Sequence, residues 1–398
     1  MAGISNRAKN MPSSPIRKLV PFADKAKEKG IEVFHLNIGQ PDIETPDVFM
    51  AYINKHGPKV VPYSHSAGLI ELRESFCKYY KRRNIDLNSD EIIITSGGSE
   101  AIIFALASVA DPNDEVIVIE PFYANYRGFA SLLNIKPVPI TSYVENGYRL
   151  PPKEAFEEVL SSKTRAILFS NPSNPTGTVY TREEMDLLIE LSKEHDLFLI
   201  SDEVYREFTF DNTKTYPLLS LYPGDRSITV DSVSKRYSAC GARIGLIASK
   251  NKEIMSSVMK FAQARLSPPA ISQLGTIGLL TLNDSYLEEI KDEYERRRDV
   301  VYEELSKIDG VVMHKPQGAF YISVALPVDD AEAFVKWMLT DFSLDGKTTM
   351  VAPLQGFYST PGRGKNEVRI AYVLSTEKLR VACNVLAEGI KVYNKIKV

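Results

Sequence analysis

The sequence predicts an α/β protein that combines a large domain, built on a mostly parallel sheet, with a smaller α+β domain. Three observations lead to this fold class. The chain has 398 residues, which is more than one domain usually holds. Short apolar runs alternate with longer amphipathic stretches through its middle, which is the rhythm of βα units. The last part, Gly310–Val398, instead has the pattern of an α+β segment.

Buried strands are expected where four or five residues rich in Ile, Val, Leu or Phe follow one another. Most of these runs are followed by Gly, Asn, Pro, Ser or Asp. Open α/β sheets bind their ligands outside the carboxyl ends of the strands, so the turns after these runs are candidate functional segments. The expected strands are Glu91–Thr95, Glu115–Ile119, Ala166–Phe169, Leu197–Ser201, Ser227–Val230 and Gly245–Ala248.

Helices are expected between the strands. Thr181–His195 opens with Thr-Arg-Glu-Glu, a capping-box pattern, and carries apolar residues at helical spacing. Ala101–Ala110 is an apolar helix, and Asp284–Ile308 is long enough to bridge two domains. Thr376–Lys391 is expected to be the closing helix.

The two ends of the chain are expected to form the smaller domain together. Met1–Pro46 is irregular and predicts an arm plus one strand that joins the C-terminal part. Within that part, Val311–His314 and Ala319–Val324 have strand patterns. The predicted division is an N-terminal arm with part of the small domain, a large domain and a C-terminal small domain, at residues 1–48, 49–290 and 291–398.

Composition excludes several kinds of partner. The net charge of −3 gives no electrostatic footprint for nucleic acid or an anionic membrane. The three cysteines, Cys77, Cys240 and Cys383, are far apart and form no CxxC pair, which argues against a disulfide scaffold and a metal site. Apolar runs reach only about half of the ~20 residues that span a bilayer. The N-terminus has no apolar signal-peptide segment, so a cytoplasmic protein is expected.

A lysine just after an expected strand is the first candidate for chemistry. Ser232 and Ser234 precede Lys235, and Arg243 follows eight residues later. This grouping suits a cofactor that carries both an aldehyde and a phosphate. The amine would form an imine, while the hydroxyls and the guanidinium would neutralise the phosphate. The alternative is an ordinary surface Lys and Arg in a loop.

Two further strand ends carry polar groups of the same kind. The Asn171–Gly177 loop contains two Asn-Pro steps, and Asn174 is placed to donate a hydrogen bond to a ring oxygen. Asp202 and Tyr205 follow the next strand. A carboxylate there would keep a pyridinium nitrogen protonated, which makes the ring an electron sink. The alternatives are an ordinary turn and an N-cap Asp beside a packed Tyr.

Two segments supply weaker signals. The Gly-rich run that contains Gly98 and Ser99 stands before the apolar helix, and helix N-termini bind phosphate well. Tyr123 follows another strand and offers a ring that would stack on a flat cofactor. Read alone, these segments equally fit a plain Gly-rich turn and core packing.

Taken together, the segments resemble the class I/II aminotransferases of pyridoxal-5′-phosphate (PLP) fold type I, the aspartate-aminotransferase-like group. The resemblance runs from Asn37–Asp42 (Asn-Ile-Gly-Gln-Pro-Asp) to Glu367–Tyr372 (Glu-Val-Arg-Ile-Ala-Tyr), which is nearly the whole chain. It implies a large domain with a mostly parallel seven-stranded sheet between helices and a smaller α+β domain built from both chain ends. It also implies a homodimer with the sites at the interface.

The resemblance implies a role for each matched residue. Lys235 would hold PLP as a Schiff base and shuttle the proton, and Asp202 would pair with the ring nitrogen. Tyr205 and Asn174 would bond the phenolic oxygen of the ring, and Tyr123 would stack on it. The remaining assignments are phosphate binding by Gly98, Ser99, Ser232, Ser234 and Arg243, a phosphate contact across the dimer interface by Tyr63, and binding of the substrate α-carboxylate by Arg369 beside Gly39.

The expected activity is transfer of the amino group of an L-amino acid to a 2-oxo acid such as 2-oxoglutarate. Aspartate is the first candidate donor, followed by alanine or an aromatic amino acid. Ser99 stands where some relatives carry a lysine for the distal carboxylate, so we assign that role to Arg265 as a hypothesis. Tyr126, Phe357 and Tyr358 would instead favour an aromatic or aliphatic donor.

Two alternative functions stay open at this point. The same constellation also serves C–S lyases and other elimination or decarboxylation enzymes, because the cofactor carries the chemistry. A PLP-sensing regulatory protein would need a basic DNA-binding module of domain size, and Met1–Pro46 is too short for one.

Overall fold

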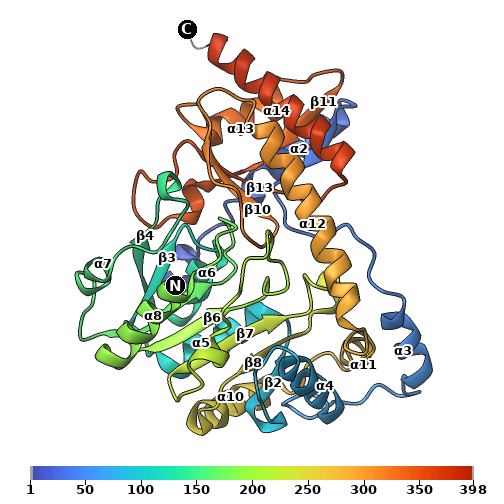
Figure 1. Ribbon diagram of the computed structural model, residues 1–398, viewed down its shortest axis with the longest axis vertical. Coiled ribbons are helices and arrows are strands. Elements are labelled where there is room, and N and C mark those ends of the chain that lie inside the picture. Colours follow the sequence, from blue (N-terminus) through green and yellow to red (C-terminus); the bar gives the residue numbers. More distant parts are fainter. Residues whose placement is uncertain (1–2, 397–398) are drawn as a thin grey trace.

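The computed structural model describes residues 3–396 and is built around a seven-stranded sheet (Figure 1). The strand order is β2-β8-β7-β6-β5-β3-β4. Only β8 runs antiparallel to its neighbours, and the other pairs are parallel. The mostly parallel sheet is therefore confirmed. The strands are β2 Ile92–Thr95, β3 Glu115–Glu120, β4 Lys136–Thr141, β5 Thr164–Ser170, β6 Phe198–Asp202, β7 Ser227–Ser232 and β8 Gly245–Ala248.

The edge strand β4 has no counterpart among the individual strands expected from the sequence. Its residues read Lys-Pro-Val-Pro-Ile-Thr, and proline is usually a sign against a strand. β4 pairs with β3 alone, and Pro137 and Pro139 stand two residues apart. The backbone nitrogens of both prolines therefore face the same side of the strand. That side is the free edge, where no N–H group is needed for pairing.

Helices cover both faces of this sheet. Side chains of α5, α6 and α10 form the core on one face, and those of α7, α8 and α9 form the core on the other. Helices α4 and α11 pack beside β2 and β8. The bounds are α3 Val48–His56, α4 Ile70–Lys81, α5 Gly98–Val109, α6 Asn125–Leu133, α7 Lys153–Glu157, α8 Arg182–His195, α9 Leu218–Leu221, α10 Lys252–Arg265 and α11 Ala270–Leu279.

The smaller domain is built from both ends of the chain, as expected. Strand β1 (Glu32–His35) pairs in parallel with β11 (Lys347–Met350), so the N-terminal segment does join the C-terminal part. A second sheet has the order β12-β13-β10-β9. Its strands are β9 Val312–Met313, β10 Tyr321–Ala325, β12 Ala352–Pro353 and β13 Glu367–Ala371, and the helices of this part are α2 Val20–Glu28, α13 Ala331–Thr340 and α14 Thr376–Ile396. The short helix α1 (Asn6–Asn10) instead contacts α6 of the large domain.

The long helix α12 (Asp284–Leu305) runs from the large sheet to the smaller domain (Figure 1). The predicted boundary between the large and the small domain, at residue 290, falls inside this continuous helix. That boundary stays a prediction. The capping box expected at Thr181 is present, with reciprocal hydrogen bonds to Glu184 at the start of α8. Within residues 3–396, no helix combines the length and the apolar character that crossing a membrane requires.

Candidate active site

A cavity of about 340 Å³ lies at the carboxyl edge of the large sheet and brings most of the predicted site residues together. Asn174 follows β5, Asp202 ends β6, and Ser232 ends β7, so three neighbouring parallel strands deliver their polar groups to one edge. Tyr63 and Arg265 do not line it. The predicted residues that line it are Gly39, Gly98, Ser99, Tyr123, Asn174, Asp202, Tyr205, Ser232, Ser234, Lys235, Arg243 and Arg369.

Lys235 lies in the turn after β7 and is half-buried. Its Nζ donates a hydrogen bond to the backbone carbonyl of Gly39 at 2.9 Å, and Cys240 Sγ lies 3.7 Å away. No carboxylate of residues 3–396 forms an ion pair with this amine. A side chain at position 39 would place its Cβ 1.7 Å from Tyr321 Oη, so glycine alone fits between that ring and the lysine.

A group of polar atoms lies around the N-terminus of α5. The backbone turns there at Gly97, whose φ of +80° favours glycine, and a Cβ at this position would lie 2.2 Å from a guanidinium nitrogen of Arg243. Ser232 Oγ and Ser234 Oγ are 2.7 Å apart on the adjacent strand end. Among the described residues, the Arg243 guanidinium donates only to the backbone carbonyls of Cys240 and Ser96. Hydroxyls, free N–H groups and an arginine without an acid suit a phosphate group.

Asp202 is a buried carboxylate that has no basic partner within the described chain. Its Oδ2 accepts a hydrogen bond from the Tyr126 hydroxyl at 2.7 Å, and its Oδ1 accepts one from the Val204 N–H at 3.3 Å. Burial raises the pKa of Asp202 to about 6, against the lowering effect of both hydrogen bonds. Such a carboxylate is primed to accept a cation or an N–H⁺ group.

Two tyrosines face each other across the cavity. The hydroxyls of Tyr205 and Tyr321 are 2.9 Å apart, and burial raises the pKa of Tyr205 well above that of an exposed phenol. Tyr321 begins β10 in the small domain. The sequence around Tyr321 has only the pattern of a core strand. That pattern does not indicate a functional residue, so Tyr321 was not among the predicted site residues.

Arg369 supplies a buried positive charge from β13. Its side chain is 2% exposed, and its terminal nitrogens donate to Asn174 Oδ1 at 2.9 Å and to the Asn37 carbonyl at 2.6 Å. Its Nε has no hydrogen-bond partner, and no acid in residues 3–396 pairs with it. The guanidinium carbon lies 4.4 Å from the ring centroid of Tyr321. Because a buried charge without a counter-charge is costly, an anionic ligand is its natural complement.

The N-terminal segment before α2 adds a second group of residues that the sequence did not identify. Ser14, Ile16 and Arg17 line the same cavity. Arg17 is exposed and has no acidic partner among the described residues. The Pro-rich arm around Arg17 contains no recognisable motif. Arg17 reaches the cavity because the N-terminal segment folds over it.

Tyr63 and Arg265 lie outside the cavity. The Tyr63 side chain is 80% exposed, and its neighbours Val60 and Val61 are 78% and 59% exposed. Arg265 pairs with Glu100 at 3.1 Å and donates to three backbone carbonyls. Tyr63 was expected to act at a partner's site and Arg265 to bind the distal carboxylate, and both roles stay predictions.

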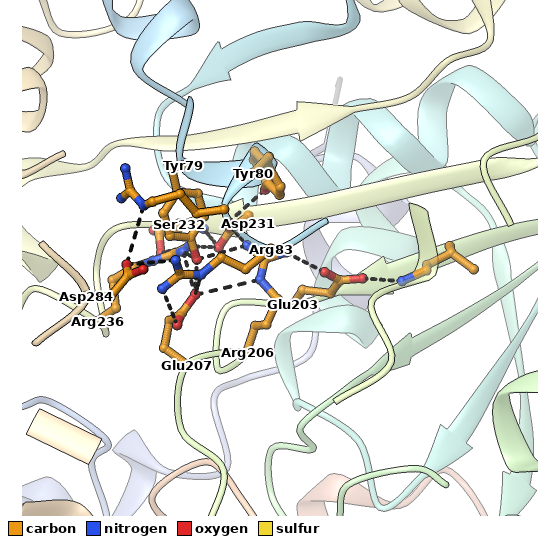
Figure 2. Close-up of polar contacts among 12 residues, drawn as sticks. Tyr79, Tyr80, Arg83, Glu203, Arg206, Glu207, Asp231, Ser232, Arg236 and Asp284 are labelled. Atoms are coloured by element: carbon orange, nitrogen blue, oxygen red, sulfur yellow. Dashed lines mark hydrogen bonds and ion pairs between the residues drawn. The ribbon is translucent and has the colours of Figure 1, made fainter. Parts of the chain in front are cut away.

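A buried ion network supports the turn that carries Lys235 (Figure 2). Asp231 accepts hydrogen bonds from the Ser232 N–H at 2.6 Å, from Arg206 at 2.8 Å and from the Tyr80 hydroxyl at 2.9 Å, and it also pairs with Arg236. These groups are all buried. The network fixes the end of β7, where the cavity-lining serines begin.

Two solved aminotransferases share this fold. A single mutant of Thermus thermophilus aspartate aminotransferase superposes with a TM-score of 0.89 at 28% identity, covering 98% of this chain and 100% of that one. The alanine aminotransferase of Pyrococcus furiosus also superposes with a TM-score of 0.89 at 28% identity and the same coverage. The architecture is therefore PLP fold type I.

The sequence comparison identifies the family. The model of the family "Aminotransferase class I and II" matches residues 31–386. The chain thus belongs to the class I/II aminotransferases, which depend on PLP. An aromatic-amino-acid aminotransferase of Thermococcus litoralis is 32% identical over 98% of both chains. An aspartate aminotransferase of Bacillus subtilis is 29% identical over 95% of this chain and 96% of its own.

Proposed function

We propose that this aminotransferase takes its amino group from L-aspartate and passes it to a 2-oxo acid such as 2-oxoglutarate. The observation that carries the proposal is the unpaired, buried Arg369, which lies in the same cavity as an unpaired Lys235. An arginine fork of this kind suits an α-carboxylate, and the amine suits the substrate carbon next to it.

The cavity fits PLP by its own donors. Bound PLP supplies a reactive aldehyde and a ring that acts as an electron sink. In our proposal, Ser232, Ser234 and Arg243 hold its phosphate together with the N-terminus of α5. The buried carboxylate of Asp202 holds a proton on the ring nitrogen. The Tyr205 hydroxyl is placed to bond the ring oxygen.

The substrate is oriented by groups that already contact one another. Asn174 Oδ1 accepts from Arg369, so the amide nitrogen of Asn174 remains as the donor toward the ring oxygen. Arg369 orients the α-carboxylate, which sets the α-hydrogen within reach of Lys235. The Lys235 amine would then accept the proton from the α-carbon and hold it at Nζ.

The choice of aspartate is supported by a further cation. Arg17 lines the cavity with an unpaired, exposed guanidinium, which suits the distal carboxylate of a dicarboxylic donor. Arg265 stays the second candidate for this role, although it would have to release Glu100. The relatives at 29–32% identity are named for aspartate and for aromatic donors, so the donor requires a direct test.

We further propose a homodimer that works in the cytoplasm. The exposed apolar residues beside Tyr63 support a covered interface, and the three free cysteines suit a reducing compartment.

The test mixes the PLP-loaded protein with single amino acids and follows the visible absorption band of the bound cofactor. Aspartate, glutamate, alanine, tyrosine and methionine form the panel. A donor that converts the band to a stable form, which 2-oxoglutarate then reverses, supports transamination, and the fastest donor names its class. Lys235→Ala should abolish the conversion, while Lys250→Ala, a change at a lysine outside the cavity, should not. Spontaneous recovery of the band with release of pyruvate and ammonia would instead indicate an elimination enzyme.

A further inference from the structure

We propose that Tyr126 is a positioning residue that keeps Asp202 ionised and aimed at the cofactor ring. The inference rests on the proposed role of Asp202. Tyr126 does not line the cavity, and it therefore acts only through the carboxylate. Its hydroxyl donates to Asp202 Oδ2 at 2.7 Å, from α6 to the end of β6.

The geometry of the Tyr126 ring is fixed by aromatic packing. The side chain is 2% exposed and stacks on Phe122 with 6.2 Å between ring centroids. It also meets Tyr123 edge-on at 5.5 Å. A phenol held in this way points its hydroxyl at one acceptor. Burial and the nearby carboxylate raise the pKa of Tyr126 well above its usual value, so it stays a donor throughout the physiological range.

The other buried carboxylates next to Asp202 have arginine partners, and Asp202 has none in residues 3–396. Arg206 pairs with both Glu203 and Asp231, and Arg236 also pairs with Asp231. Both carboxylates raise the pKa of Asp202 by repulsion, after the larger effect of burial. The lowering contributions come from the Tyr126 hydroxyl and the Val204 N–H. Tyr126 is thus the side-chain hydrogen-bond donor that favours the charged form before the cofactor arrives.

The sign of the effect follows from this arrangement. A hydrogen bond to the ionised carboxylate lowers its pKa, so its removal raises a pKa that already lies at about 6. The Tyr126→Phe apoprotein should therefore lose PLP affinity at a higher pH than the unmodified apoprotein. A bond of this type is expected to move the low-pH midpoint upward by about one unit.

The experiment measures PLP binding to the apoprotein between pH 5 and 9 by visible absorbance. At pH 6, Tyr126→Phe should bind PLP about fivefold more weakly than the unmodified protein, and near pH 8.5 the two should agree. The ionisation of the PLP phosphate is common to both proteins and cancels in the comparison. Tyr148→Phe is the matched control, because it removes a buried phenol that donates to another carboxylate, Glu367, which does not line the cavity. Its midpoint should stay unchanged.

A double-variant cycle keeps the test decisive even if Tyr126→Phe is less stable. In an Asp202→Asn background the low-pH step should vanish, and adding Tyr126→Phe should then move nothing. An equal loss of affinity at every pH, or a shift that survives in Asp202→Asn, would overturn the positioning role. If Asp202→Asn itself leaves PLP binding unchanged at all pH values, the proposed cofactor site is at fault rather than Tyr126.

Discussion

At the scale of single residues, charge pairing separates the site from the rest of the interior. Buried Arg206, Arg236 and Arg298 each pair with one or more carboxylates. Arg369 is equally buried and has only neutral acceptors. A protein interior keeps an unpaired charge only where a ligand or a cofactor completes it, because desolvation is otherwise uncompensated. The same reasoning applies to Asp202, a buried negative charge that has no basic partner in residues 3–396.

Removing the Arg369 charge should therefore affect the substrate far more than the cofactor. We expect Arg369→Gln to lower kcat/KM for the amino donor by about 10²–10³-fold, the equivalent of a lost buried charge pair. Arg369→Lys should retain part of the activity, because the charge remains while the two-pronged geometry is lost. Steady-state kinetics give the ratio, and PLP binding is the control. A comparable loss of PLP affinity would show that Arg369 instead supports the fold of the site.

Arg17 offers the sharper test of donor choice. Arg17→Met should lower kcat/KM for aspartate by about tenfold and leave that for alanine nearly unchanged, because alanine has no second carboxylate. Arg7→Met, a change at an exposed arginine of α1 outside the cavity, is the matched control. Equal losses for both donors would refute a role in specificity and return attention to Arg265.

The sequence allowed the prediction of site residues where the cause is local. Lys235, Asp202 and Asn174 each follow a strand, and parallel strands place such residues at one edge whatever the rest of the chain does. Tyr321 and Arg17 line the same cavity, and Tyr126 contacts Asp202 from outside it, but no local pattern predicts these positions. Their roles depend on contacts across 76, 116 or more residues, which periodicity does not record.

At the scale of elements, the end of β7 is held by the network around Asp231. Two arginines from different turns share this carboxylate, and Tyr80 reaches it from α4. The end of β7, which leads into the turn with Lys235, gains a fixed position from these bonds. Through the bond from Tyr80 to Asp231, the packing of α4 on the sheet thus helps to fix the cavity-lining residues that follow β7.

Arg236→Met should destabilise the fold by about 3 kcal/mol, because it leaves a buried carboxylate with one cation where it had two. Chemical denaturation measures the change in the free energy of unfolding. Arg182→Met is the control, since it breaks an exposed pair with Asp186 and should change stability little. An equally small effect of both variants would mean that Arg206 alone satisfies Asp231.

Elements differ in how far local sequence determines them. The N-terminus of α8 was predictable because Thr181 and Glu184 cap it through bonds three residues apart. β4 was not, because two prolines conflict with a strand pattern and are tolerated only at an edge. That β4 lies at the edge is a property of the sheet order and not of its own residues.

At the scale of the whole molecule, the cavity is assembled from distant parts of the chain. Gly39 and Arg17 come from the N-terminal segment, Arg369 from β13, and Lys235 from the large domain. The parallel pairing of β1 with β11 brings the two chain ends together beside the sheet edge. The site therefore exists only when both domains are folded and in contact.

The proposed dimer extends this assembly across two chains and makes the strongest prediction about Tyr63. Tyr63→Phe should weaken PLP binding about tenfold if its hydroxyl contacts the phosphate of the partner's site. The exposed side chain does not line the cavity of its own chain, so the effect should cross the interface. Sedimentation analysis should first show dimers for both the unmodified protein and the variant.

Mixed dimers then distinguish the two arrangements. In a dimer of one Tyr63→Phe chain and one Lys235→Ala chain, the only competent lysine lies in the Tyr63→Phe chain. If Tyr63 acts across the interface, that site receives an intact tyrosine from the Lys235→Ala partner, and half of the sites recover normal PLP affinity after the two proteins are exchanged. If Tyr63 acts within its own chain, no site in the mixed dimer has both groups, and the weakened affinity persists. Recovery on mixing therefore requires that each site of the dimer is completed by the other subunit.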